Sequence, residues 1–249
     1  MQNNFYFIGN ISNIYKKPSK LSEVTSQILY GEKFKILSKN KSWIKIKASF
    51  DNYVGYIENK KHKKKFTPIY KVHNLKAKIY KKPNYSSKSW LPFGSKLSVI
   101  SENKNYVEIE KNKWIKKSDI KKINHQEKNF VKIFKKFLNV KYIWGGKTYK
   151  GIDCSALLQI FSYYNNLFYP RDTKDQIKYT KGNLKKKSLK KGNIIFWKGH
   201  VAMCLNSKEL IHAYGPRKKV LIMSTKQTIK LISEKAKLKV KKISNIKKF

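Results

Sequence analysis

The first half of this 249-residue chain repeats itself, and the repeat constrains the fold more than any other feature. The string Ile-Tyr-Lys-Lys-Pro occurs at 14–18 and again at 79–83. Each copy is followed by a glycine that opens an apolar alternation, at 31–37 and at 94–100. Short alternating segments separated by turns are typical of antiparallel strands. The sequence therefore predicts two copies of a small antiparallel barrel.

The spacing within the two copies also agrees. In each copy the next predicted strand begins 12 residues after the glycine, at Trp43 and at Tyr106. Short aromatic strands at 54–57 and 113–115 close the copies. Between them, residues 59–65 are mostly lysines, which repel one another and are typical of a linker. The copies resemble tandem bacterial SH3-like domains, and we expect these domains to span 1–60 and 66–122.

The remainder of the chain, 123–249, has a different pattern. An amphipathic stretch at 127–138 predicts a helix, and a second helix is expected to begin at Cys154. The tail from 228 to 249 is basic but carries spaced apolar residues, so most of it should pack. Strand patterns follow the helices at 193–197, 200–205 and 209–214. Helices followed by antiparallel strands indicate an α+β fold class, here preceded by two small β-barrels.

Cys154 stands where a cysteine can become reactive. It follows Asp153, a favourable helix N-cap, and begins an apolar helix face that continues through Leu157, Leu158 and Phe161. A helix N-terminus favours negative charge and can lower a thiol pKa from about 8.5 to roughly 3.5–7.5. We therefore expect a thiolate at neutral pH, although a lone cysteine of this kind more often only packs.

Two histidines strengthen the catalytic interpretation. His200 and His212 fall on neighbouring predicted strands, and a reversal centred on Asn206 would place their Cβ atoms about 4.5–5.5 Å apart. One imidazole can take the thiol proton and return it to a leaving amine, while the second fixes the tautomer of the first. A cysteine at a helix start followed by two facing histidines predicts a nucleophilic hydrolase.

Several motifs, in this order, resemble those of the NlpC-type cell-wall cysteine peptidases. The matching strings are Tyr-Ile-Trp-Gly-Gly from Tyr142, Asp-Cys-Ser at 153–155, Pro-Arg-Asp-Thr from Pro170 and Gly-His-Val at 199–201. The resemblance covers about 124–249, and the repeated half resembles the N-terminal half of the subgroup that trims murein peptides. It implies a papain-like domain over 123–249. It also implies hydrolysis of the γ-D-glutamyl bond to meso-diaminopimelate or L-lysine in stem peptides with a free N-terminal L-Ala, in cell-wall turnover or recycling.

The same resemblance implies roles for the catalytic residues. Cys154 would be the nucleophile, His200 the base and His212 the residue that orients the base. Tyr142 matches a family tyrosine whose hydroxyl points at the thiol. That hydroxyl could bind the oxyanion together with the backbone amide of Cys154.

The resemblance further implies a pocket for the substrate's terminal ammonium group. Asp153, Ser155 and Thr173 of the Arg171-Asp172-Thr173 motif would hold the amine, since a carboxylate and two hydroxyls suit a cation. Candidates from the first SH3-like domain that would complete this pocket are Glu32 and Tyr53. Blocking the substrate end in this way would make the enzyme release Ala-Glu dipeptides.

The chain is very basic, with a formal net charge of +44. All but two of its basic side chains are lysines, the exceptions being Arg171 and Arg217. Readers of nucleic acids depend on arginine for bidentate contacts. We therefore interpret the lysines mainly as solvated surface residues and expect no specific nucleic-acid partner. Nonspecific nucleic-acid binding, an anionic membrane or wall surface, and steering of acidic substrates are the alternatives.

Cysteine usage and hydropathy suggest further expectations. Cys154 and Cys204 are the two cysteines and show no metal-binding spacing, so we expect neither a disulfide nor a metal or other cofactor. No apolar stretch is long enough to span a membrane, and the N-terminus has no signal-peptide pattern. The expected location is cytoplasmic, or periplasmic or wall-associated if a leader was removed.

Three other functions compete with hydrolysis. A noncatalytic protein could use the repeats to bind peptidoglycan, an acyltransferase could use the same nucleophile, and a basic nucleic-acid-binding protein could use the net charge. The intact cysteine and two histidines count against the first, and the scarcity of arginine counts against the last. The residues leave open the choice between diaminopimelate and lysine, and the oligomeric state.

Overall fold

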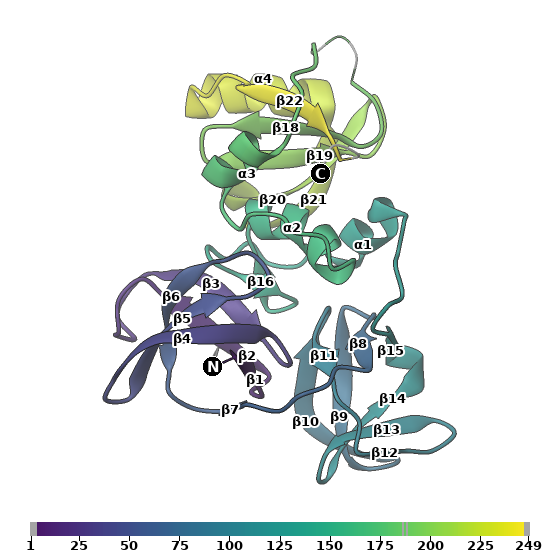
Figure 1. The fold of residues 1–249 in the computed structure, drawn as a ribbon. Coiled ribbons are helices and arrows are strands. Elements are labelled where there is room, and N and C mark those ends of the chain that lie inside the picture. The colour runs from purple at the N-terminus through teal and green to yellow at the C-terminus, as the bar shows by residue number, and fades with distance from the viewer. Residues whose placement is uncertain (1–3, 186, 188, 247–249) are drawn as a thin grey trace. The chain divides into compact units, whose positions relative to one another are not determined.

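The computed structural model describes residues 4–185, 187 and 189–246 (Figure 1). The chain divides into an N-terminal unit that ends at Gln126 and a C-terminal unit that begins at Glu127. The described part of the N-terminal unit is built of antiparallel strands, and that of the C-terminal unit combines four α-helices with a five-stranded sheet. The predicted α+β fold class is confirmed. No helix among the described residues is long and apolar enough to cross a membrane.

The first repeat forms one sheet in the order β3-β2-β6-β5-β4-β1-β7. Its strands are β1 (Asn4–Phe7), β2 (Ile11–Tyr15), β3 (Val24–Leu29), β4 (Lys33–Asn40), β5 (Trp43–Ala48), β6 (Val54–Glu58) and β7 (His62–Lys63). The strands predicted at 31–37, 43–47 and 54–57 correspond to β4, β5 and β6. Alternate residues of β5, such as Ile44 and Ile46, are fully buried, as expected for a strand with one face on a core.

The segment expected to be a linker contributes the last strand of this sheet. β7 pairs with β1, so that Lys63 lies opposite Tyr6. The ring of His62 contacts Phe5 and Phe34, with centroids 5.1 and 6.0 Å away. Charge repulsion among the flanking lysines therefore does not prevent this segment from pairing, because it can pack a ring on the aromatic core.

The second repeat divides its strands between two sheets, in the orders β10-β9-β14-β13-β12 and β11-β8-β15. Its elements are β8 (Tyr70–Val72), β9 (Lys76–Lys82), β10 (Tyr85–Pro92), β11 (Lys96–Leu97), β12 (Ser101–Glu102), β13 (Tyr106–Glu110), β14 (Lys113–Lys116), the 3-10 helix η1 (Lys117–Asp119) and β15 (Ile120–Lys122). The prediction of a continuous strand over 94–100 was wrong. The chain pairs with β8 through β11 and then changes sheets to pair with β13 through β12, which interrupts the strand.

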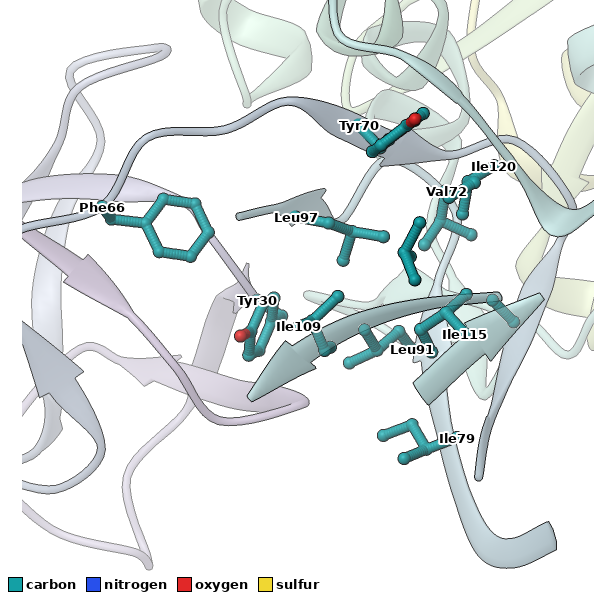
Figure 2. Close-up of a cluster of buried hydrophobic side chains, with 12 residues drawn as sticks. Tyr30, Phe66, Tyr70, Val72, Ile79, Leu91, Leu97, Ile109, Ile115 and Ile120 are labelled. Carbon is teal, nitrogen blue, oxygen red and sulfur yellow. The ribbon is translucent and has the colours of Figure 1, made fainter. Parts of the chain in front are cut away.

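The two repeats share a core within the N-terminal unit. Tyr30 and Phe66 pack into the apolar cluster of the second repeat, which includes Leu97 and Ile109 (Figure 2). The Tyr30 carbonyl accepts a hydrogen bond from the Lys96 amide at 2.9 Å. Gly31, at φ +76°, follows directly, and a Cβ there would lie 2.1 Å from the Lys96 carbonyl oxygen. Only glycine therefore allows this close approach.

The C-terminal unit surrounds the Cys154 helix with a sheet in the order β21-β20-β19-β18-β22. Its elements are α1 (Phe130–Lys136), β16 (Lys147–Thr148), β17 (Gly151–Ile152), α2 (Cys154–Tyr164), α3 (Thr173–Tyr179), β18 (Asn193–Trp197), β19 (His200–Cys204), β20 (Glu209–Tyr214), the 3-10 helix η3 (Gly215–Arg217), β21 (Lys219–Ser224), α4 (Thr225–Ala236) and β22 (Lys242–Asn245). The predicted strands are confirmed. The tail packs through α4 and β22, while residues 247–249 of that prediction lie outside the described residues.

The helix predicted at 127–138 is shorter than expected. It begins at Phe130 because the side chain of Asn129 caps it, accepting a hydrogen bond from the Val131 amide at 3.2 Å. Asn139 has a left-handed backbone, φ 63°, just beyond its end. α1 packs on α2, where Phe134 and Phe161 lie with ring centroids 6.3 Å apart. Nearly every residue of α2 is buried, so the start of this helix is held firmly beside the sheet.

Candidate active site

Cys154 is the first residue of α2, as the sequence predicts. Asp153 has an extended backbone, and its carboxylate caps the helix by accepting from the Ala156 amide at 2.8 Å. The chain reaches this point through the β16–β17 hairpin. A Cβ on Gly146 would lie 2.5 Å from the Gly151 carbonyl oxygen, so the hairpin can close only with glycine there. The N-cap prediction for Asp153 is confirmed.

The thiol of Cys154 lies against the start of β19 and is only 5% exposed. Its Sγ is 3.9 Å from the Gly199 carbonyl oxygen, to which it can donate. The Val201 amide and the Thr173 hydroxyl lie near enough to stabilise its charged form. The paired part of β19 and β20 ends at Met203 and Ile211. The thiol therefore contacts the backbone carbonyl that directly precedes β19, beyond the point where β20 pairs with that strand.

The protonation state of the thiol differs from the expectation. Burial raises the pKa of Cys154 to about 11, and the Asp153 charge adds to this, while the neighbouring amide and hydroxyl and Arg171 act in the opposite direction. The predicted resting thiolate was wrong, because desolvation of a fully enclosed sulfur outweighs what stabilises its charge. The thiol is neutral at pH 7.

The two histidines meet directly. Nε2 of His200 lies 3.0 Å from Nδ1 of His212, and the His212 ring stacks on Tyr214 with centroids 4.7 Å apart. Burial lowers the pKa of His200 to about 4. Burial, with a smaller effect of His200, lowers the pKa of His212 to about 3. Both imidazoles are therefore neutral at pH 7.

The histidines do not pair across the strands as predicted. Met203 lies opposite Ile211 and Cys204 opposite Leu210, which centres the reversal on Ser207 instead of Asn206. The rings meet beyond the paired part of the two strands. The predicted register was wrong, yet the predicted contact is present, because both residues lie near the end where the strands separate.

The thiol and the imidazoles belong to one site. Cys154 and His212 line the same small cavity between α2 and the sheet, and the Gly199 carbonyl that meets the thiol directly precedes His200. Within the described part of the chain, no hydrogen bond joins the thiol to either ring. Such contacts commonly tighten only when substrate binds. The resting site is thus an uncharged thiol with an uncharged imidazole pair.

Tyr142 approaches this site from the preceding loop. Its amide donates to the Lys218 carbonyl at 2.8 Å, and the residue forms a parallel bridge with Ile152. Burial raises the pKa of its hydroxyl, and the nearby charges of Cys154 and Asp153 raise it further. The hydroxyl therefore keeps its proton at neutral pH and can donate a hydrogen bond.

A buried ion pair holds the helix start. Arg171 binds Asp153 through two hydrogen bonds, Nη2 to Oδ2 at 2.6 Å and Nη1 to Oδ1 at 3.0 Å. The Gly145 amide donates to Oδ2 at 3.0 Å, and the Ser155 hydroxyl donates to Oδ1 at 3.1 Å. The carboxylate thus accepts from five donors, the Ala156 amide included, and its lone pairs are used. This geometry positions the nucleophile and leaves Asp153 little capacity to hold a substrate ammonium group.

Asp172 and Thr173 lie on the open side of this network. Asp172 is the N-cap of α3 but makes no capping hydrogen bond with its side chain, which is only partly exposed. Burial raises the pKa of Asp172, and the Arg171 charge acts against the shift. Thr173 begins α3, and its hydroxyl acts to lower the pKa of the Cys154 thiol. Among the residues of the Arg-Asp-Thr motif, Asp172 has the carboxylate that is available to a ligand.

The two candidates from the first repeat lie in the other unit. Glu32 is 2% exposed, and its carboxylate accepts from the Leu29 amide at 2.7 Å. The Tyr53 hydroxyl is 3.5 Å from the Thr25 carbonyl oxygen. Glu32 therefore supports its own turn, and the substrate-binding role of both residues stays a prediction.

Two residues that contact the site were not among those predicted for it. Met223 on β21 places its Sδ 3.3 Å from Nε2 of His212. Nε2 of Gln176 on α3 donates hydrogen bonds to the carbonyl oxygens of Ser155 and Pro170, both at 2.9 Å. Gln176 follows Thr173 by one turn of α3 and belongs to the motif that resembles the family's, although no role was predicted for it, whereas nothing in the sequence around Met223 marks that residue. Among the described residues no cluster of His, Cys, Asp or Glu is suited to hold a metal ion.

Comparison with known proteins finds a matching family for part of each unit. Residues 139–234 match the NlpC/P60 family, and residues 14–61 match the bacterial dipeptidyl-peptidase SH3 domain. The gamma-D-glutamyl-L-lysine dipeptidyl-peptidase of Bacillus subtilis is 23% identical over 231 residues, which cover 83% of this chain and 77% of that protein. A probable endopeptidase NlpC homolog of Haemophilus influenzae is 31% identical over 90 residues, 35% of this chain and 49% of that protein.

A solved structure shares the fold. An NlpC/P60 family protein from Bacillus cereus superposes with a TM-score of 0.75 at 19% identity, covering 89% of this chain and 94% of that one. The likeness establishes the fold, a papain-like domain preceded by an SH3-like β region.

Proposed function

We propose that this cysteine peptidase, an NlpC/P60 domain preceded by bacterial SH3-like domains, hydrolyses the γ-D-glutamyl bond to L-lysine or meso-diaminopimelate in murein peptides with a free N-terminal L-Ala. The observation that carries the proposal is the buried Cys154 thiol at a helix start beside the paired rings of His200 and His212. The name of the relative from Bacillus subtilis, a gamma-D-glutamyl-L-lysine dipeptidyl-peptidase, supports the choice of bond.

Acylation begins from an uncharged site. His200 uses Nε2 to contact His212, so its Nδ1 is the nitrogen that can accept the thiol proton. The sulfur then attacks the γ-carbonyl carbon of the D-glutamyl residue. The helix-start amide of Cys154, which has no intrahelical partner, and the Tyr142 hydroxyl are the donors proposed for the oxyanion. Moving the proton during attack avoids forming a buried thiolate in advance.

The second half of the reaction releases two products. The His200 imidazolium gives its proton to the amine of the diamino acid as the C–N bond breaks. Water then attacks the thioester, with neutral His200 taking a proton from the water and returning it to the sulfur. The acyl product is L-Ala-γ-D-Glu, and the thiol is restored.

Asp172 is the carboxylate proposed to hold the substrate's terminal ammonium group. It lies next to Thr173, whose hydroxyl is near enough to the thiol to lower its pKa, and its side chain is not used to cap α3. Asp153, which carries the matching prediction from the sequence, is already neutralised by Arg171 at 2.6 Å. We therefore assign Asp153, Ser155 and Arg171 to positioning, and keep Glu32 and Tyr53 as predicted contributors to the ammonium pocket.

A peptide assay tests the proposal. The full chain is incubated with L-Ala-γ-D-Glu-L-Lys, with the diaminopimelate analogue, and with N-acetylated forms of both. We expect cleavage of a free-amine peptide into L-Ala-γ-D-Glu and the diamino acid, and no cleavage of the acetylated forms. Cys154→Ala should lower kcat by at least about 10⁴-fold.

Matched variants sharpen this assay. Cys204→Ala removes the other buried cysteine and should leave kcat near the wild-type value. Asp172→Asn should raise KM for the free-amine peptide, because the carboxylate charge is lost. Addition of an amine acceptor separates hydrolysis from acyl transfer, since a transferase would form the amide in place of the free dipeptide. Equal cleavage of acetylated and free peptides would contradict the ammonium pocket.

A further inference from the structure

The pair of imidazoles contacts a third group, the thioether of Met223. His200 Nε2 lies 3.0 Å from His212 Nδ1, and His212 Nε2 lies 3.3 Å from the sulfur of Met223. Among the described residues His212 makes no other side-chain hydrogen bond. The chain of contacts thus runs from the base, through the orienting histidine, to a thioether.

The direction of the hydrogen bonds in this chain decides whether His200 can act as a base. Neutral imidazole carries one proton, on one of its two nitrogens. His200 can accept the thiol proton at Nδ1 only if its own proton is on Nε2, which must then be donated to Nδ1 of His212. His212 must in turn carry its proton on Nε2. The opposite arrangement would put a proton on Nδ1 of His200 and block the reaction.

A thioether sulfur distinguishes these two arrangements. Sulfur in methionine accepts a weak hydrogen bond but has no proton to donate. It can therefore bind the N–H form of His212 Nε2, whereas with the opposite tautomer two lone pairs would face each other in a buried site. Burial lowers the pKa of both imidazoles, so both rings stay neutral and their tautomers matter at pH 7.

We propose that Met223 is a positioning residue that selects the His212 tautomer with the proton on Nε2, and so keeps Nδ1 of His200 free to accept the thiol proton. This inference rests on the proposed function, in which His200 is the base.

The register of β20 and β21 places Met223 beside His212. On β20 and β21, His212 lies opposite Leu221, and Leu210 lies opposite Met223. Met223 is therefore the diagonal neighbour of His212 on the same face of the sheet, a distance that a long side chain can reach. Its stem packs against the apolar cluster that includes Leu210 and Tyr214, which holds the sulfur in position.

Histidine tautomers measured by nitrogen NMR test the proposal separately from turnover. The full chain is labelled with ¹⁵N-histidine, and His212→Asn assigns the His212 signals. In the wild type we expect a protonated Nε2 and an unprotonated Nδ1 on His212. Met223→Leu keeps the volume but removes the acceptor, so we expect a mixed or reversed tautomer. Its kcat should fall by about 5- to 50-fold with KM unchanged.

Two further variants keep the test decisive. Met223→Gln offers both an amide oxygen that can accept and an amide NH2 that can donate, so it should lose the selection and give a mixed tautomer, as Met223→Leu does. Ile222→Leu, a conservative change at the neighbouring position of β21, should alter neither the tautomer nor kcat. A wild-type His212 with its proton on Nδ1 overturns the proposal, and so does a Met223→Leu protein with the wild-type tautomer. If the tautomers are as expected but no peptide is cleaved, the proposed function fails and the assignment of Met223 as the tautomer-selecting residue does not.

Discussion

The two units stabilise the charge of a buried cation to different extents. Lys71, on β8 of the N-terminal unit, is 1% exposed, and burial together with the charge of Lys96 lowers its pKa to about 8. Arg171, in the C-terminal unit, is 2% exposed and binds the Asp153 carboxylate at 2.6 Å. The charged state is disfavoured at Lys71, whereas Arg171 is held in a bidentate ion pair.

The difference shows where burial of charge serves the proposed chemistry. A charge removed from water is costly unless a partner compensates it. In the C-terminal unit the compensated pair fixes the N-cap of α2 and with it the nucleophile. In the N-terminal unit the buried Lys71 lies on β8 opposite Lys96 of β11, and burial disfavours its charge. Removal of the two cations should therefore have different effects, a loss of stability at Arg171 and a changed pH dependence of stability at Lys71.

The largest expected effect follows removal of Arg171. Arg171→Met leaves the Asp153 carboxylate buried without its cation, which should lower the free energy of unfolding by about 3–5 kcal/mol. Urea denaturation of the full chain measures this, and kcat should fall as the helix start loosens. Lys174→Met removes an exposed lysine three residues later and is the matched control. A loss below about 1 kcal/mol for Arg171→Met would break the comparison, because it would fall in the range of a neutral hydrogen bond.

The next effect concerns the neutral site. His200 must be unprotonated to accept the thiol proton, and burial lowers its pKa to about 4. The acid limb of kcat/KM should therefore lie below the ordinary histidine range near pH 6.5 and move toward pH 4. The thiolate absorbance, measured as wild type minus Cys154→Ala, should be small at pH 7 and grow toward pH 11, the pKa of the buried thiol. A full thiolate signal at pH 7 would contradict the neutral resting site and indicate a thiolate paired with an imidazolium.

A smaller effect is expected at the junction of the repeats. Gly31→Ala places a Cβ 2.1 Å from the Lys96 carbonyl at φ +76°, so the backbone must shift. We expect the free energy of unfolding to fall by about 1–3 kcal/mol. Gly199→Ala, at φ +73° with no atom within 4 Å of the added Cβ, carries the cost of the left-handed backbone without the clash. Equal losses in the two variants would mean that the contact with Lys96 contributes nothing.

The smallest effect is a change of slope with pH. Unfolded Lys71 holds its proton up to about pH 10.5, whereas the folded form loses it near pH 8. Between these values the unfolded state binds more protons, so the free energy of unfolding should rise with pH. Lys71→Met should remove this rise relative to the wild type, and Lys88→Met, at an exposed position, should not. Identical slopes in all three proteins would show that Lys71 is not titrating in this range.

Much of the fold followed from local patterns. Alternation of apolar residues located β5 and β13, because a strand with one buried face needs that period, and short apolar runs located β18, β19 and β20, whereas β21 and β22 were not predicted. The change of sheets after β11 was missed, since it depends on which neighbours pair with the chain. The pairing of β7 was missed for the same reason, because the lysines around it give no sign that His62 packs on Phe5 and Phe34.

The site divides in the same way. Asp153 as N-cap and Cys154 as the first residue of α2 follow from a few adjacent residues, and these predictions are confirmed. The state of the thiol did not follow, because the helix start favours a thiolate while the surrounding structure removes the water that would stabilise it. The ion pair between Asp153 and Arg171 also depends on tertiary packing, since 18 residues separate them in the chain.

The sequence by itself determined the repeated strands, the helix that begins at Cys154 and the presence of two histidines able to serve it, because these depend on short-range periodicity and capping. Only the tertiary structure decided that the thiol and both imidazoles are neutral, that Asp153 is bound by Arg171, and that Met223 contacts His212. Burial and hydrogen-bond partners set those properties, and they arise only when segments distant in the chain are packed together.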